Sequence, residues 1–171
     1  QEQSIWLGTD YGISLSRYNS ALQFIPISQI TGTGDGNQFY SLFRDSKGFY
    51  WFGGTNGVIR FTHPAGNKHD AIWYRMGDKN HPLSHNRIRH IYEDREQQLW
   101  IATDGSINRY DYNTHQFVHY NIVDSTGTNN TNWAYYLFED TDGKLWIATC
   151  LGGIFVVDKQ KLVQSSGGTY I

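Results

Sequence analysis

The sequence predicts an all-β protein made of about four repeated units. An apolar segment centred on Trp occurs four times, and the Trp residues are separated by 45, 49 and 46 residues. Short segments rich in aromatic and β-branched residues alternate with Gly-containing turns, a pattern typical of β-strands. A β-sandwich also has short strands, but it gives no reason for one motif to recur every ~46 residues. The period is that of a four-stranded blade, so we expect a β-propeller fragment of about four blades, each a four-stranded antiparallel sheet.

Three of the units share a fixed Asn–Asp–Trp spacing. The Asp stands six residues before the Trp, and the Asn stands eight residues before the Asp. Because a residue that recurs in each unit serves the fold, we assign these positions structural roles rather than catalytic ones. The nine residues are Asn37, Asp45, Trp51, Asn86, Asp94, Trp100, Asn132, Asp140 and Trp146. The spacing predicts an incomplete blade at 1–30, two blades at 37–80 and 86–124, and an incomplete blade at 132–171.

Each unit is expected to begin with an inner strand between the Asn and the Asp, at 39–43, 88–92 and 134–138. The Asp opens a turn in which Gly48 and Gly143 supply positive φ angles. The third unit has Gln97 where the other two have Gly, so its turn is expected to differ. The Trp-centred segment forms the second strand, and its indole fills space between neighbouring blades.

Third and fourth strands complete each blade in this prediction. The third strands are expected at 13–18, 58–61, 107–110 and 154–157. The fourth strands are expected at 24–27, 72–74 and 117–120, and residues 161–171 occupy the corresponding place in the last unit.

The composition excludes several functional classes. The formal net charge is -2 and no block of Lys and Arg is present, so we expect no nucleic-acid partner. No apolar run approaches the ~18 residues of a membrane span. The single cysteine, Cys150, cannot form a disulfide within the chain.

No metal site, cofactor or catalytic site is expected. The histidines show no zinc-binding spacing and no HExxH motif. They are His63, His69, His81, His85, His90, His115 and His119. A catalytic carboxylate pair has to converge on one substrate, whereas Asp45, Asp94 and Asp140 take the same place in three units.

Four segments of the third unit resemble the two-component regulator propeller repeat. They are Leu-Ser-His-Asn-Arg-Ile at 83–88, Ile-Tyr-Glu-Asp at 91–94, Leu-Trp-Ile-Ala-Thr-Asp-Gly at 99–105 and Ile-Asn-Arg-Tyr-Asp at 107–111. The resemblance implies the periplasmic sensor region of a hybrid two-component histidine kinase. That region precedes a linker, a membrane helix and a kinase, and it senses oligosaccharides for polysaccharide utilisation. A complete sensor of this kind holds more repeats, so we interpret the chain as a non-enzymatic fragment of one.

Two other functions remain open: a propeller polysaccharide lyase or glycosidase, and a protein-interaction propeller. The expected partners are an oligosaccharide and the remaining propeller blades of the parent chain. An open arc of blades exposes strand edges and apolar faces at its two ends, so association of copies through those ends is also expected.

A ligand site is expected where the units differ, at the beginning of the inner strands. Trp and Tyr offer flat faces for stacking on sugar rings, and Arg offers paired hydrogen bonds to carboxylate or sulfate. This set would suit an acidic oligosaccharide, although Trp133 and the tyrosines also fit a purely packing role. The candidate ligand-binding residues are Gln38, Tyr40, Arg87, Arg89, Trp133 and Tyr135.

Overall fold

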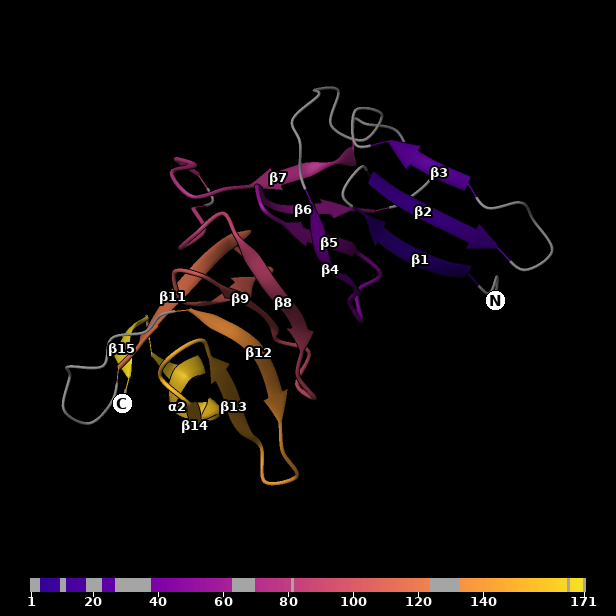
Figure 1. Cartoon of the computed structure of the whole chain (residues 1–171). Helices are drawn as coiled ribbons and strands as arrows, with labels where there is room; N and C mark the ends of the chain where they lie inside the picture. The colour runs from indigo at the N-terminus through magenta and orange to yellow at the C-terminus, as the bar shows by residue number, and fades with distance from the viewer. Residues whose placement is uncertain are drawn as a thin grey trace.

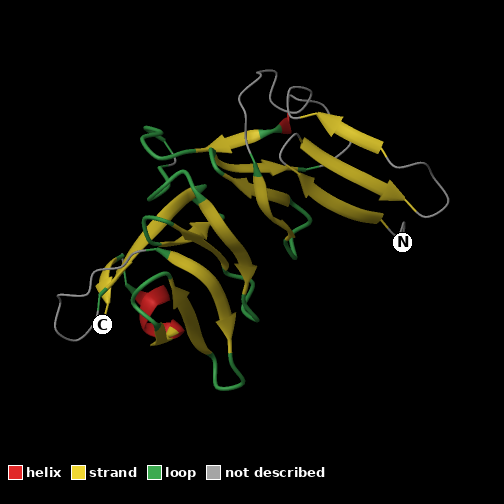
Figure 2. Ribbon diagram, viewed as in Figure 1, coloured by secondary structure: helices red, strands yellow, loops and turns green. Residues whose placement is uncertain are grey.

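The computed structural model contains four sheets of mainly antiparallel strands, which follow one another along the chain (Figure 1). It describes residues 4–9, 12–17, 23–26, 38–62, 70–80, 82–123, 133–165 and 167–170. In Figure 1 the sheets run from the indigo N-terminal sheet to the yellow C-terminal segment, with the two chain ends on opposite sides. Strands dominate the described chain, as the ribbon in Figure 2 shows. The prediction of an all-β propeller fragment is confirmed.

The first two sheets are simple meanders in which neighbouring strands are antiparallel. The first sheet has the order β1-β2-β3 and the second has the order β4-β5-β6-β7. The first is formed by β1 (Ser4–Thr9), β2 (Gly12–Arg17) and β3 (Gln23–Pro26). The second is formed by β4 (Phe39–Arg44), β5 (Tyr50–Gly54), β6 (Gly57–Phe61) and β7 (Ile72–Tyr74).

The third and fourth sheets continue the pattern with one exception. The third sheet is formed by β8 (Ile88–Glu93), β9 (Leu99–Thr103), β10 (Ile107–Asp111), β11 (Gln116–Ile122) and β15 (Gly168–Tyr170). The fourth is formed by β12 (Ala134–Glu139), β13 (Lys144–Thr149) and β14 (Ile154–Asp158). The exception is β15, which pairs in parallel with β11 of the third sheet.

The chain after β14 does not continue as a fourth strand of the last sheet. Asp158 ends β14 and accepts a hydrogen bond from the Gln160 backbone N–H, which caps the short helix α2 (Lys159–Gln164). The helix takes the chain back across the third and fourth sheets, and Leu162 packs into the core between them.

The core lies between successive sheets. The Trp51 and Trp100 side chains are fully buried, and each faces the following sheet. Trp51 packs against Tyr110 of the third sheet, with ring centroids 4.9 Å apart. On the adjacent position of each Trp strand, Ile101 and Ile147 are buried against the preceding sheet. The third blade therefore presents an indole forward and an aliphatic side chain backward, and Phe52 takes the place of the aliphatic residue in the second blade.

The two end sheets expose the surfaces that are buried in the middle. In the last sheet Trp146 is 39% exposed and Phe138 is 53% exposed, whereas the equivalent Trp100 is fully buried. In the first sheet Ile5 and Leu7 are exposed.

Candidate ligand-binding rim

A β-bulge occurs at the same place in the three inner strands. The pairing register shifts between Phe39 and Ser41 in β4, and at the equivalent positions in β8 and β12. The extra residues are Tyr40, Arg89 and Tyr135, three of the six predicted ligand-binding residues. A bulge redirects a side chain out of the regular pleat and is frequent beside functional sites.

The other three predicted residues lie at the ends of the same strands. The carbonyls of Gln38, Arg87 and Trp133 accept backbone hydrogen bonds, of 3.0, 3.2 and 2.9 Å, from the residues four positions after each repeated Trp. Those donors are Thr55, Asp104 and Cys150. Sequence reasoning missed them, although their constant offset from the Trp was a usable signal.

These nine positions form one edge of the three blades, which we call the rim. Two of the three positions hold a different residue type in each blade, and the bulged position is Tyr in the second and fourth blades and Arg in the third. The rim consists of Gln38, Tyr40, Thr55, Arg87, Arg89, Asp104, Trp133, Tyr135 and Cys150. Because β8 contacts both β4 and β12, the rim residues of the third blade lie between those of the second and the fourth.

The Arg89 side chain contacts its own blade and the next one. It donates two hydrogen bonds to Asp104, from Nε to Oδ1 at 2.6 Å and from Nη2 to Oδ2 at 3.0 Å. Its guanidinium carbon lies 4.4 Å from the ring centroid of Tyr135 in the next blade. The bond to Asp104 raises the pKa of Arg89, with smaller contributions from Tyr135 and Tyr40. Two of the predicted residues, Arg89 and Tyr135, are thereby brought together across neighbouring blades.

The remaining rim contacts are local. The Tyr40 hydroxyl donates to Gln38 Oε1 at 2.8 Å. A hydrogen bond with Cys150 raises the pKa of Tyr135. Trp133 is 48% exposed, and its described polar contact is the one that its carbonyl makes with Cys150. Its indole face is therefore open to solvent.

The repeated Asp residues hold their own turns and the indoles. One oxygen of Asp45, Asp94 and Asp140 accepts the Trp Nε1–H of its blade, at 2.8, 2.8 and 2.7 Å respectively. The other oxygen accepts the backbone N–H four residues later, at 2.8, 2.9 and 2.9 Å. The Trp146 and Lys144 donors lower the pKa of Asp140. With both oxygens bound, these carboxylates are geometrically unsuited to proton transfer.

The expectation of a different turn at Gln97 is wrong. Gln97 has a φ of 62°, in the left-handed region that Gly48 and Gly143 also occupy. The backbone bond from Gln97 N–H to the Asp94 carbonyl is 2.9 Å, matching the 3.0 Å bond from Gly48 to Asp45. The hydrogen bonds to Asp94 are strong enough to hold a residue with a Cβ in this conformation.

The repeated Asn has a visible role in one blade. Asn86 Oδ1 accepts the Met76 backbone N–H at 2.7 Å, and the Asn86 carbonyl accepts that of Gly57 at 2.6 Å. It thus ties the loop after β7 to the hairpin of β5 and β6. Asn37 and Asn132 lie outside the described residues.

Two glutamates that sequence reasoning missed join successive blades. Glu93 accepts the Ser46 backbone N–H of the preceding blade at 2.9 Å, and Glu139 accepts that of Arg95 at 2.9 Å. Each stands directly before the repeated Asp of its own blade, and that fixed position was the available signal.

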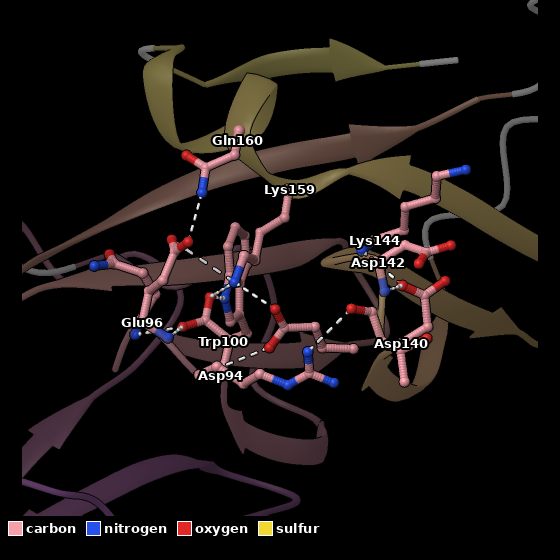
Figure 3. A network of polar contacts seen from close by, with 12 residues as sticks. Asp94, Glu96, Trp100, Asp140, Asp142, Lys144, Lys159 and Gln160 are labelled. Atoms are coloured by element: carbon pink, nitrogen blue, oxygen red, sulfur yellow. Dashed lines mark hydrogen bonds and ion pairs between the residues drawn. The ribbon is translucent and has the colours of Figure 1, made fainter.

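A charged network reinforces the contact between the third and fourth blades (Figure 3). Lys159 of α2 is buried, and its Nζ lies 2.7 Å from Glu139, 3.3 Å from Asp94 and 3.7 Å from Glu96. Burial lowers the pKa of Lys159, but the bond to Glu139 and the charge of Asp94 outweigh it, so the net shift is upward. Burial raises the pKa of Glu139, but Lys159 and the Arg95 N–H reverse the shift, and the pKa is lowered. The network joins blades and has no part in the rim.

Within the described residues no three His, Cys, Asp or Glu side chains cluster as metal ligands would. His63, His69 and His81 lie outside the described residues. No helix in the described part of the chain is long and apolar enough to cross a membrane.

The succession of sheets and the repeated Asp–Trp pair define this chain as a segment of a β-propeller. A model of the two component regulator propeller family matches residues 33–56, 82–105 and 128–150. The chain is therefore a member of the two-component regulator propeller family.

Solved structures agree with this assignment. The chain is 85% identical to the extracellular domain of a protein from B. thetaiotaomicron, BT4673, described as a hybrid two component system. The match covers 100% of this chain and 23% of that domain, with a TM-score of 0.83. A second structure of BT4673, described as a one component system, is 81% identical over 99% of this chain and 23% of its own, with a TM-score of 0.79. This chain thus spans about a quarter of the relatives' length.

A more distant structure shares the fold alone. A virginiamycin B lyase from Staphylococcus aureus is 15% identical, with coverage of 91% of this chain and 59% of the lyase and a TM-score of 0.58. No curated protein matches the chain significantly.

Proposed function

We propose that this chain is part of the periplasmic sensor region of a hybrid two-component histidine kinase, and that its rim binds an oligosaccharide. Its 85% identity to an extracellular domain described as belonging to a hybrid two component system supports the first part. The parent protein then carries the remaining blades, a membrane anchor and the kinase, while this segment performs no chemistry itself.

The observation that carries the binding role is the rim itself. Where the blades are otherwise built alike, the three bulged positions hold Tyr40, Arg89 and Tyr135. Tyr40, Trp133 and Tyr135 are 47%, 48% and 38% exposed, so each offers aromatic surface to a ligand, although Arg89 covers one face of the Tyr135 ring. Flat aromatic faces beside guanidinium groups suit stacking on sugar rings together with hydrogen bonds to their substituents.

The rim does not favour the alternative of a lyase or glycosidase. General acid–base chemistry on a sugar needs two ionisable groups that flank one bond. Among the described rim residues, Asp104 is the one carboxylate, and both of its oxygens are already bonded to Arg89.

The test is calorimetric titration of the full natural protein with a panel of oligosaccharides, for wild type and Trp133→Ala. We expect at least one oligosaccharide to bind and Trp133→Ala to weaken it about tenfold or more, because an exposed indole face is lost. Trp73→Ala is the matched control, since Trp73 lies on the outer strand β7 beneath Arg75, away from the rim. Unchanged affinity in Trp133→Ala, or an equal loss in both variants, would contradict the assignment of the rim.

A further inference from the structure

We propose that the rim selects an oligosaccharide that carries an anionic group, a carboxylate or a sulfate, and that Arg87 is the residue that binds this group. The inference rests on the proposed function and specifies its ligand.

The first step is the charge balance of the rim. The described rim residues include two guanidinium groups, Arg87 and Arg89, and one carboxylate, Asp104. Asp104 is committed to Arg89 through the two short hydrogen bonds. The distance from Arg87 Nε to Asp104 Oδ2 is 3.8 Å, longer than a hydrogen bond. One positive charge is therefore left over, and it belongs to Arg87.

The second step is access. The Arg87 side chain is 47% exposed, compared with 20% for Arg89 and 7% for Asp104. A guanidinium presents its donors in a planar fork that matches the paired oxygens of a carboxylate or sulfate. Arg87 can donate from both sides of its guanidinium to a ligand, whereas Arg89 already donates from Nε and Nη2 to Asp104.

The third step is preorganisation. The Arg87 backbone N–H donates to His85 Nδ1 at 3.0 Å, and its carbonyl accepts from Asp104 N–H at 3.2 Å. The backbone is thus fixed on both sides of the residue, which reduces the entropy lost when the side chain is ordered by a ligand. The bonded Arg89–Asp104 pair keeps the buried carboxylate from repelling an incoming anion.

The fourth step is the surroundings of Arg87. Its blade lies between the blades that carry Tyr40 and Trp133, since β8 contacts both β4 and β12. A sugar chain lying along the rim would place its rings on aromatic faces at both sides and an acidic substituent in the middle. This order of groups fits an acidic oligosaccharide better than a small anion, because a small anion bound to Arg87 would not contact the flanking aromatic rings.

The test compares three probes on the full natural protein by calorimetry: a hexuronic acid oligosaccharide, the same oligosaccharide reduced at its carboxyl groups, and a sulfated neutral oligosaccharide of equal length. We expect at least one anionic probe to bind about tenfold or more tightly than the reduced probe, and its affinity to fall as salt is raised. The anionic probe that binds identifies the group as carboxylate or sulfate.

Arg87→Gln is the test variant, and Arg44→Gln is the matched control. Arg44 is an exposed arginine at the opposite end of β4, above the ring of Tyr50. We expect Arg87→Gln to abolish the preference for the anionic probe and Arg44→Gln to retain it. Equal affinity for anionic and reduced probes, with Trp133→Ala still weakening both, would overturn the ligand class and leave the proposed function intact. Binding of none of the probes or of the wider oligosaccharide panel would instead overturn the proposed function.

Discussion

At the scale of single residues, the turn at Gln97 shows that hydrogen bonds can hold a residue with a Cβ in an unfavourable backbone conformation. A left-handed φ costs a residue with a Cβ about 1 kcal/mol relative to Gly. Asp94 offsets this cost with bonds to the N–H groups of Glu96 and Gln98, each 2.9 Å long. The turn keeps the geometry of its Gly-containing counterparts and is held under mild strain.

Gln97→Gly is expected to stabilise the protein by about 1 kcal/mol, because the Gln97 side chain is exposed and its removal relieves the backbone. Urea denaturation measures the change. The reciprocal substitution Gly48→Ala should destabilise by about the same amount, since φ is 89° and the new methyl group meets no close neighbour. A loss of stability in Gln97→Gly would show that the side chain contributes more than the strain costs.

At the scale of secondary-structure elements, α2 is a short helix whose stability depends on what it packs against. Six residues are too few to hold a helix in water by themselves. Lys159 and Leu162 are buried at the junction of the third and fourth blades, whereas Lys161 of the same helix is exposed. The helix is therefore fixed by two apolar side chains, Leu162 and the partly buried Val163, and by one buried ammonium group.

Lys159→Met is expected to cost about 3–5 kcal/mol in the free energy of unfolding, because it leaves the Glu139 and Asp94 carboxylates without their buried cation. Lys161 lies on the exposed side of the same helix. In urea denaturation, the free energy of unfolding of Lys161→Met should therefore differ from that of wild type by less than about 0.5 kcal/mol. Adding Glu139→Gln to Lys159→Met should recover part of the loss. If the single variant were as stable as wild type, the network would contribute nothing to the junction of the blades.

At the scale of the whole molecule, successive blades are joined by bonds that begin on the backbone of one blade and end on a side chain of its neighbour. At the junction of the second and third blades, Ser41 Oγ accepts the Ile91 N–H at 3.0 Å. At the next junction His90 Nδ1 accepts the Leu137 N–H at 3.2 Å. The His90 ring also stacks on Tyr136, with centroids 4.0 Å apart. Of these two acceptors, the His90 imidazole is the one that can be protonated near neutral pH.

This difference predicts a pH dependence of stability. Burial lowers the pKa of His90 in the folded protein, so the unfolded chain binds the proton first as the pH falls through its ordinary value of about 6.5. Stability contributed by neutral His90 is fully present above that pH. It is lost below it at up to about 1.4 kcal/mol per pH unit until the lowered pKa is reached.

Urea denaturation between pH 7.5 and 5.5 measures this loss. We expect the free energy of unfolding of His90→Gln to fall less steeply than that of wild type as the pH is lowered over that range. Between pH 7.5 and 8.5, where His90 is neutral in both states, wild type and variant should show the same slope. An unchanged pH dependence in His90→Gln would exclude a role for this junction.

The Asn–Asp–Trp spacing located the strands well because it records contacts within one blade. The predicted fourth strand at 72–74 coincides with β7, and the inner strands differ by a residue at one end. The site was harder to predict. Glu93 accepts a hydrogen bond from Ser46 in the preceding blade, and Asp104 accepts hydrogen bonds from Arg89 on a different strand. A single sequence does not reveal which carboxylates make such contacts with distant residues. Lys159 has no counterpart in the other units, so no repeat could identify it.

The separation of rim and interface within each blade has a consequence for how such a protein changes over generations. The surfaces that join blades lie on the faces of the sheets, with an indole on one face and another apolar side chain on the opposite face, whereas the three rim positions lie at one end of the strands. A recombination that exchanges one repeat for another therefore keeps the buried indole and replaces three rim residues at once. Exchange of repeats therefore changes the composition of the rim separately from the Trp contacts between the sheets.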